Sequence, residues 1–444
     1  MSNASLQPVP SGRAASANPC EPEKIFRKVA WRIMPVLFLI FVLSYMDRVN
    51  IGYAKLQFSR ELGLSDAMYG TGAGIFFIGY LVSGIPSNLL LARIGARATI
   101  SRIMISWGIV SSLMTFISTP AQFYLLRFLL GLAEGGLAPG VYLYLTYWFP
   151  STLRARMIAI FLAAIPVAGV LCAPMSGFLL DIMHNVYGLA GWQWMFLIEG
   201  LPSVVVGVLI YFLIENSPNS APWLTASERE TVSTALASDV RNNSFTASRV
   251  SVSDAFKSRI FFVLVVIEII GGVSVAGFAY WLPQIVHDLG VTSLRKNGVI
   301  TAIPYLSASV GMVIWGYSSD YFHERRWHYA IAASGGGFAL FVACQNASHF
   351  QIAIGALALA YTGIMSCVSV FWAYATAYLK GGAAVVGIGI LNSIASLAAY
   401  LSQYAFGAVS MAKNNSLFGL YGIAFALFVG AILMLSAPQN LQTT

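Results

Sequence analysis

The chain has 444 residues, of which 58% are hydrophobic and only 9% are charged. Because a soluble globular domain carries about 25% charged residues, this composition excludes that class and favours a membrane protein with several helical spans. The formal net charge of +8 would suit a nucleic-acid-binding protein, but the placement of the basic residues along the chain explains it by membrane topology instead.

The chain opens with a polar segment, residues 1–23, which is rich in small side chains and lacks the apolar core of a signal peptide. We predict a disordered cytoplasmic tail there and a further cytoplasmic tail at 438–444. The cysteines are scattered and have the spacing of neither a disulfide framework nor a metal site, so we expect no metal and no cofactor. They are Cys20, Cys172, Cys344 and Cys367.

Apolar stretches long enough to span a membrane follow in two groups of six. They lie near residues 33–54, 69–91, 99–118, 121–147, 157–180 and 192–214, and then near 259–283, 297–319, 329–346, 350–379, 384–408 and 417–437. The sequence thus predicts an N-terminal bundle (24–214), a polar cytoplasmic linker (215–257) and a C-terminal bundle (258–437). In the linker, Thr225 and Glu228 have the spacing of a capping box, which predicts a short surface helix.

The basic residues fit one orientation of these spans. If both termini are cytoplasmic, most of the 25 Lys and Arg residues fall on the cytoplasmic side. This bias is the positive-inside pattern of helical membrane proteins. The residues predicted on the opposite side are Lys55, Arg60, Arg295, Lys296 and Lys413.

Two charged residues, Asp47 and Arg48, are adjacent in the first apolar segment. A charge near the bilayer centre costs about 2.5–3.5 kcal/mol on insertion scales, so such residues are mostly functional. We expect the two to form an ion pair. Loss of hydration favours the neutral acid, whereas the arginine favours the carboxylate, so a substrate anion that competes for the arginine would change the protonation of Asp47. The alternative is a permanent structural ion pair.

Arg127 and Glu134 lie in the fourth apolar segment, seven residues apart and therefore on one helix face. They are too far apart for a standard pair at i and i+4, so each is expected to face another helix. The alternative is a charge network that only fixes helix packing. Glu268 lies near the middle of the seventh segment and is a candidate proton or substrate contact, or else a neutral buried acid. We expect Glu199 to brace helix ends.

The two groups of spans share a repeated sequence feature. The second segment ends in PSNLLLARIGAR (86–97) and the eighth in GYSSDYFHERR (316–326), so both close an apolar helix with a short basic loop. Internal repeats of this kind are typical of secondary transporters, in which the substrate site lies at mid-membrane between the two halves.

Several stretches carry a resemblance to a known family: SYMDRVNIGYA (44–54), FFIGYLVSGIPSNLLLARIGAR (76–97), LLRFLLGLAEGGLAPG (125–140), YLTYWFPSTLRAR (144–156), GWQWMFLIEGLPS (191–203) and YWLPQIV (280–286). From about residue 24 to 437 the chain resembles the major facilitator superfamily. Within it, the chain resembles the anion–cation symporter family, which includes bacterial carriers for sugar acids, tartrate, phthalate and 4-hydroxyphenylacetate and, more distantly, sialin. The loop pattern G-x-x-x-D-R-x-G-R-[RK] is incomplete in the first half, where Ala92 stands for its Asp. The resemblance therefore implies no complete charge relay in that loop.

The resemblance implies an all-α fold of about twelve helices in two pseudo-symmetric six-helix bundles. It implies that Asp47 and Glu134 bind protons, that Arg48 binds the substrate carboxylate, and that Arg127 partners Glu134 or Asp47. Tyr45 and Tyr80 resemble hydroxyl donors to the substrate. Ser369, Trp372 and Asn392 resemble substrate-lining positions, with packing as the alternative. The loop residues are Arg93, Gly95 and Arg97 in the first half and Asp320 and Arg325 in the second.

The function predicted from these features is not enzymatic. We predict a monomeric proton-coupled symporter that imports a small organic carboxylate across the bacterial inner membrane by alternating access. The apolar stretch FLAAIPVAG (161–169) favours a less hydroxylated or aromatic carboxylate, because hydroxyl groups would go unpaired against it. A symporter for sugar acids or tartrate and an exporter of organic anions remain the alternatives.

Overall fold

The computed structural model describes residues 21–247, 258–379 and 382–438, and these residues are almost entirely helical. Within these ranges, twelve helical segments are long and apolar enough to cross a membrane. The predicted tails at 1–20 and 439–444, and linker residues 248–257, lie outside the described residues. The predicted N-terminal tail is too long at its inner end, because Glu21 to Glu23 already belong to the first helix.

The first six spans form the N-terminal half. Its helices are α1 (Glu21–Glu61), α2 (Asp66–Ile94), α3 (Ala96–Leu113), α4 (Pro120–Glu134), α5 (Leu137–Thr146), α6 (Ser151–Leu162), α7 (Ala164–Ile182) and α8 (Gly191–Leu213). Two spans are interrupted, between α4 and α5 and between α6 and α7. The first break directly follows Glu134, where Gly136 has a φ of +92° that L side chains rarely adopt.

The other six spans form the C-terminal half. They are α11 (Arg259–Asp288), α12 (Leu294–Tyr321), α13 (Arg326–Gln345), α14 (Phe350–Tyr378), α15 (Gly382–Lys413) and α16 (Phe418–Ser436). In the described residues, two of these helices begin with hydroxyl caps, Ser258 for α11 and Ser293 for α12; Ser293 Oγ accepts a hydrogen bond from the Lys296 backbone N–H at 3.4 Å. The predicted architecture of two groups of six spans is confirmed.

The two halves pack along three helix pairs, α2 against α15, α7 against α12, and α1 against α11. Small residues allow these backbones to approach closely. A Cβ atom on Gly70 of α2 would lie 2.4 Å from the Gln403 carbonyl oxygen of α15, and one on Gly177 of α7 would lie 2.9 Å from the Gly298 Cα atom of α12. We call the bundle end that holds Glu61, Asp66 and Asp288 the far end, and the opposite end the linker end.

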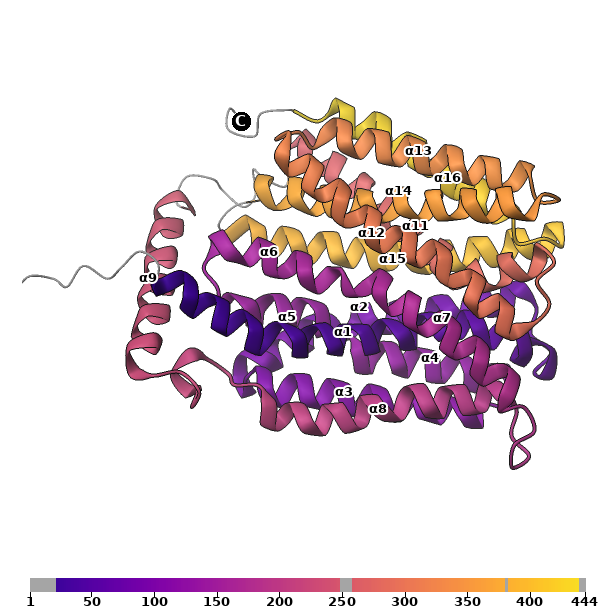
Figure 1. Cartoon of the computed structure of the whole chain (residues 1–444), viewed down its shortest axis with the longest axis horizontal. Coiled ribbons are helices and arrows are strands. Elements are labelled where there is room, and N and C mark those ends of the chain that lie inside the picture. Colours follow the sequence, from indigo (N-terminus) through magenta and orange to yellow (C-terminus); the bar gives the residue numbers. More distant parts are fainter. Residues whose placement is uncertain (1–20, 248–257, 380–381, 439–444) are drawn as a thin grey trace, which may run out of the picture.

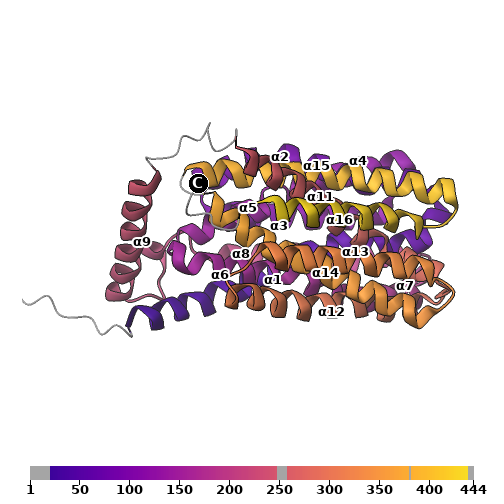
Figure 2. The same cartoon turned by 90° about the horizontal axis from the view of Figure 1, so that it is seen from above.

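The described part of the linker is attached to the N-terminal half. Its helix α9 (Ala226–Ala247) lies across the linker end of the bundle (Figures 1 and 2). The predicted capping box is present, and the helix is longer than predicted. Glu228 pairs with Lys28 of α1 at 2.8 Å, and Asp239 pairs with Arg154 of α6 at 3.3 Å. Both partners belong to the N-terminal half, so α9 is docked on that half.

Candidate functional site

An ion pair between α1 and α4 lies at the centre of the candidate site. Arg48 Nε donates a hydrogen bond of 2.8 Å to Glu134 Oε1, and Arg48 Nη2 approaches the same oxygen at 2.7 Å. Ser44 Oγ also donates to Oε1. Glu134 is completely buried and its second oxygen has no hydrogen-bond partner among the described residues, whereas the Arg48 side chain is 13% exposed. The arginine is therefore the member of the pair that a solute can reach.

Aromatic rings surround the Arg48 guanidinium. Its Cζ atom lies 4.8 Å from the ring centre of Tyr80, 5.4 Å from that of Phe76 and 5.8 Å from that of Tyr45. A cation over the face of an aromatic ring is attracted by the ring quadrupole. The structure thus brings Tyr45, Tyr80 and Glu134 together around Arg48, and it adds Phe76, which the sequence did not single out.

The expected ion pair between Asp47 and Arg48 is wrong. Consecutive residues of a helix point about 100° apart, so neighbours in sequence do not face each other. Asp47 is buried and accepts hydrogen bonds from Trp107 Nε1 and, at 2.8 Å, from Ser111 Oγ, both on α3. Ser203 of α8 and Asn50 of α1 lie at 3.5 and 3.4 Å from its oxygens. Asp47 therefore faces α3 and α8 rather than the arginine.

Arg127 contacts neither Glu134 nor Asp47. Its Nη2 atom donates to the Ala73 carbonyl oxygen at 3.2 Å, and its Nε has no partner among the described residues. Seven helical residues span about 10 Å, which separates Arg127 from the carboxylate on its own helix. The buried guanidinium instead lies over the rings of Phe76, at 4.9 Å, and Tyr280, at 5.9 Å. Both arginines therefore contact Phe76.

The C-terminal candidates make contacts within their own half. Ser369 Oγ donates to the Ser366 carbonyl oxygen at 2.9 Å, Trp372 packs edge-on against Phe371, and Asn392 is half-buried. Among the described residues, no hydrogen bond or ion pair joins their side chains to the Arg48 site.

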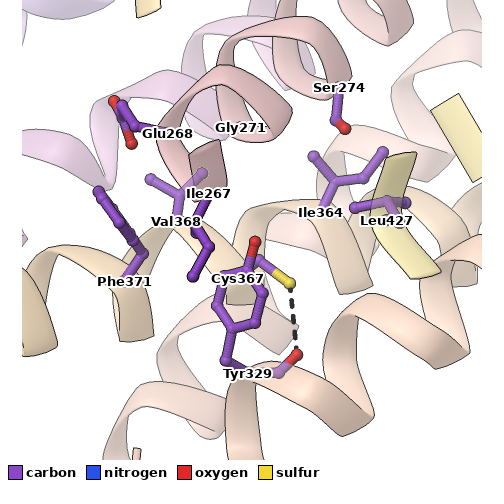
Figure 3. Close-up of a pocket in the computed structure, with 10 residues that line it drawn as sticks. All are labelled: Ile267, Glu268, Gly271, Ser274, Tyr329, Ile364, Cys367, Val368, Phe371 and Leu427. Carbon is purple, nitrogen blue, oxygen red and sulfur yellow. Dashed lines mark hydrogen bonds between the residues drawn. The ribbon is translucent and has the colours of Figure 1, made fainter. Parts of the chain in front are cut away.

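Glu268 is nearly buried, at 8% exposure, and has no hydrogen bond or ion pair among the described residues. It borders a small cavity within the C-terminal half, between α11, α13, α14 and α16. Tyr329 and Cys367 line the other side of that cavity. Figure 3 shows the Glu268 carboxyl group pointing away from both of them.

The two basic loops differ in their contacts. In the second half, Arg325 pairs with Asp320 at 2.5 Å. In the first half, the Arg97 backbone N–H donates to Asn216 Oδ1 at 3.0 Å, and its side chain donates to the Tyr211 carbonyl at the end of α8. Gly95, with a φ of +88°, leaves the space that Asn216 occupies, while Arg93 is exposed. The first loop lacks the aspartate of the family pattern. Its Arg97 instead donates hydrogen bonds to α8 and to the linker.

Sequence reasoning missed a polar network at the far end, because it placed Lys55 outside the membrane. Lys55 is 4% exposed and lies 2.8 Å from Asp66 Oδ1 and 2.7 Å from Gln284 Oε1. Asp66 Oδ2 accepts a hydrogen bond of 2.5 Å from Ser410. The network joins α1 and α2 to α11 and α15. The sequence did carry a signal, since Lys55 follows Arg48 by seven residues and so shares its helix face.

Glu199 of α8 accepts a hydrogen bond of 2.6 Å from Ser176 of α7. It is buried and its other oxygen has no hydrogen-bond partner among the described residues. This contact links the interiors of the two helices, whereas the sequence predicted a brace at helix ends.

Comparisons with known proteins agree with this architecture. A protein of Agrobacterium vitis, named as a candidate tartrate transporter, is 39% identical over 424 residues, covering 95% of this chain and 93% of the relative. A candidate metabolite transport protein of Pseudomonas putida, NicT, is 37% identical over 417 residues, covering 94% and 95%. The crystal structure of a D-xylose-proton symporter has the same fold, with a TM-score of 0.74 at 16% identity, covering 93% of this chain and 99% of that one.

The family profile described as Major Facilitator Superfamily matches residues 37–403. Together with the transporter names of the relatives and the twelve candidate spans, this match shows a multi-pass membrane transporter rather than an enzyme. The chain belongs to the Major Facilitator Superfamily.

Proposed function

We propose that the protein is a proton-coupled symporter that imports a small organic carboxylate through the bacterial inner membrane. The observation that carries the proposal is the pairing of a partly exposed arginine, Arg48, with a fully buried carboxylate, Glu134. The pair lies within membrane-spanning helices, where a second carboxylate would have few other cations to bind.

Competition for the guanidinium supplies the coupling. While Glu134 is ionised, it occupies the Nε and Nη2 side of Arg48, and an incoming carboxylate meets a cation that is already neutralised. Protonation of Glu134 removes its charge and frees the arginine for a charge-assisted bond with the substrate. Loss of the proton restores the internal pair and releases the anion. Substrate and proton therefore bind together.

Asp47 is proposed as a second proton site that acts on helix packing rather than on the substrate. Its donors belong to α3 and α8, and a neutral acid would hold Trp107 and Ser111 less strongly than a carboxylate does. Two protons per monovalent anion would carry one net positive charge inward. The membrane potential would then contribute about 2.3 kcal/mol per 100 mV.

The sidedness follows from charge. Basic residues concentrate at the linker end, which supports a cytoplasmic location for that end and for both termini. The Lys55 network and the close contacts of α2 with α15 then close the periplasmic side. In this assignment the periplasmic side is closed, as release of substrate and proton to the cytoplasm requires.

The Phe76 ring, which lies beside both Arg48 and Arg127, supports an aromatic or weakly hydroxylated carboxylate, because it offers no hydrogen-bond partner for hydroxyl groups. A tartrate-type substrate is the second candidate, favoured by the name of the Agrobacterium relative.

Uptake into proteoliposomes tests the proposal. With an acidic outside and a neutral inside, labelled substrate should accumulate above its external concentration and carry inward current. Substrate accumulation that does not depend on the pH gradient would contradict proton coupling. Electroneutral uptake would contradict the stoichiometry of two protons per anion. Uptake into inside-out but not right-side-out vesicles would identify an exporter instead.

A further inference from the structure

We propose that Glu268 is a substrate-recognition residue in the C-terminal half, and that it selects organic acids carrying a second group that is cationic or donates hydrogen bonds. This inference rests on the proposed function, because it assumes that the substrate carboxylate binds Arg48. It names the chemistry of the other end of the substrate.

The first observation is that Glu268 has no structural partner. The other buried carboxyl groups inside the spans each accept a hydrogen bond: Asp47 from Ser111, Glu134 from Arg48, and Glu199 from Ser176. Glu268 accepts none among the described residues. Its carboxyl oxygens are not among the fully enclosed unpaired atoms, so they keep access to solvent and are free to bind a solute.

The second observation is the direction in which Glu268 faces. Glu268 lines the mainly apolar cavity of its own half, and its carboxyl group points away from Tyr329 and Cys367, which lie across that cavity (Figure 3). Glu268 lies on α11, which packs against α1 of the opposite half, the helix that carries Arg48. The acid and the arginine therefore belong to neighbouring helices on the two sides of the interface between the halves.

The third observation is the charge pattern that results. A solute between the halves would meet a guanidinium on the N-terminal side and an acid on the C-terminal side. A molecule with a carboxylate at one end and an ammonium or hydroxyl group at the other would satisfy both. A dicarboxylate would bring a second anion toward Glu268, so the arrangement disfavours a dianion such as tartrate.

A series of ligands that differ only in the second group tests this inference. One aliphatic set is butyrate, 4-hydroxybutyrate, 4-aminobutyrate and succinate, and one aromatic set is benzoate, 4-hydroxybenzoate, 4-(aminomethyl)benzoate and terephthalate. Binding to the purified full-length protein is measured by ligand-induced thermal shift and by competition. In at least one set, we expect the amino or hydroxy compound to bind about tenfold or more tighter than the unsubstituted acid, and the dicarboxylate to bind weakest.

Substitution of the acid should change this ranking. Glu268→Gln should lose the preference for the amino compound and bind the dicarboxylate more tightly than the wild type does. Glu268→Asp keeps the charge and should keep the ranking, which covers the case in which Glu268→Gln fails to fold. Glu199→Gln is the matched control, because it removes another buried carboxyl group that already has a partner, and its ranking should equal that of the wild type.

The failures of the two proposals are distinguishable. A ranking that is the same in the wild type and in Glu268→Gln, or tightest binding of a dicarboxylate by the wild type, overturns the role of Glu268 and leaves the symporter proposal intact. Binding of none of the compounds, or binding that survives Arg48→Ala, overturns both.

Discussion

The two halves of the molecule share a fold but not their chemistry. Inside its spans, the N-terminal half holds Asp47, Arg48, Arg127, Glu134 and Glu199, and all of these except Arg48 are buried. Among the described residues of the C-terminal half, Glu268 is the one carboxyl group at a comparable depth. The six-helix repeat is therefore symmetric in its backbone and asymmetric in its charge.

This difference indicates how the work is divided between the halves. In the proposed mechanism the two groups that exchange protons, Asp47 and Glu134, both lie in the N-terminal half, so they stay on one side of the interface between the halves. The C-terminal half then presents a largely uncharged surface to the N-terminal half. The two halves can separate there without breaking buried ion pairs, and breaking such a pair would cost free energy. The far-end network, at the rim of the interface, is the exception, because it joins Lys55 directly to Gln284.

The largest effect that would test this division is expected from Arg48→Ala. Removing the guanidinium should abolish the ligand-induced thermal shift and reduce uptake by at least about 100-fold, because a carboxylate leaving water would find no cation. Arg48→Lys keeps the charge but loses the planar fork, so we expect partial activity. An unchanged thermal shift in Arg48→Ala would move the anion site away from the N-terminal half.

Glu134→Gln should separate binding from accumulation. The amide cannot carry a proton cycle, but it leaves Arg48 free, so we expect ligand binding and substrate exchange to persist while uptake against a gradient is lost. The measurement compares counterflow with uphill uptake in the same proteoliposomes. Asp181→Gln, at the end of α7, is a control that should transport normally. If the Glu134→Gln variant still accumulated substrate against its gradient, Glu134 would not be a coupling residue.

The sequence predicted the spans well, because long apolar runs and the distribution of basic residues report directly on the membrane. Through the family resemblance it marked Tyr45 and Tyr80 as hydroxyl donors to the substrate; both rings lie beside Arg48, and the donor role stays a prediction. The partners of the charged side chains were harder to predict from the sequence. The pair of Asp47 and Arg48 was inferred from adjacency, but helix geometry turns neighbours apart, and the partner of Arg48 lies 86 residues away on α4.

Contacts between helices that are distant in sequence were not predictable from one chain. Nothing local to Lys55 indicates Gln284 or Ser410, since these partners are brought together only by the packing of the two halves. The absence of a partner at Glu268 is equally a property of the assembled bundle. The break after Glu134 was hinted at by two consecutive glycines, whose conformational freedom the turn requires.

Lys55→Met should weaken the closed far end without touching the Arg48 site. The apolar side chain keeps the volume but loses the bonds to Asp66 and Gln284, so conformations open at this end should become about tenfold or more populated. Spin labels at the exposed positions Arg60 and Lys413, one on each half, should show a longer-distance population by double electron–electron resonance. Lys296→Met removes an exposed charge at the same end and should leave the distances unchanged. Equal distances in all three proteins would show that the network does not hold the halves together.

The smallest expected effect concerns the ion pair between Glu228 of the linker helix α9 and Lys28 of α1, which attaches the linker to the N-terminal half. The hydrogen bond from Lys28 to Glu228, together with the Thr225 backbone N–H, holds the pKa of Glu228 below its usual value. Because the folded pKa is lowered, the contribution of this pair to stability is present above the unfolded pKa of about 4.3 and is lost as the pH falls through the lowered value. Glu228→Gln should therefore lower the melting temperature slightly at neutral pH, by less than about 1 kcal/mol in stability, and not at all in strong acid.

The control for this prediction is Glu230→Gln, which removes an exposed carboxylate from the same helix. It should leave the melting temperature unchanged at both pH values. If both variants lowered it equally, general charge on α9 would be responsible rather than the bond to α1. A difference confined to Glu228→Gln would instead tie the linker helix to the charged half, because both ion pairs that α9 forms in the described residues end on α1 and α6.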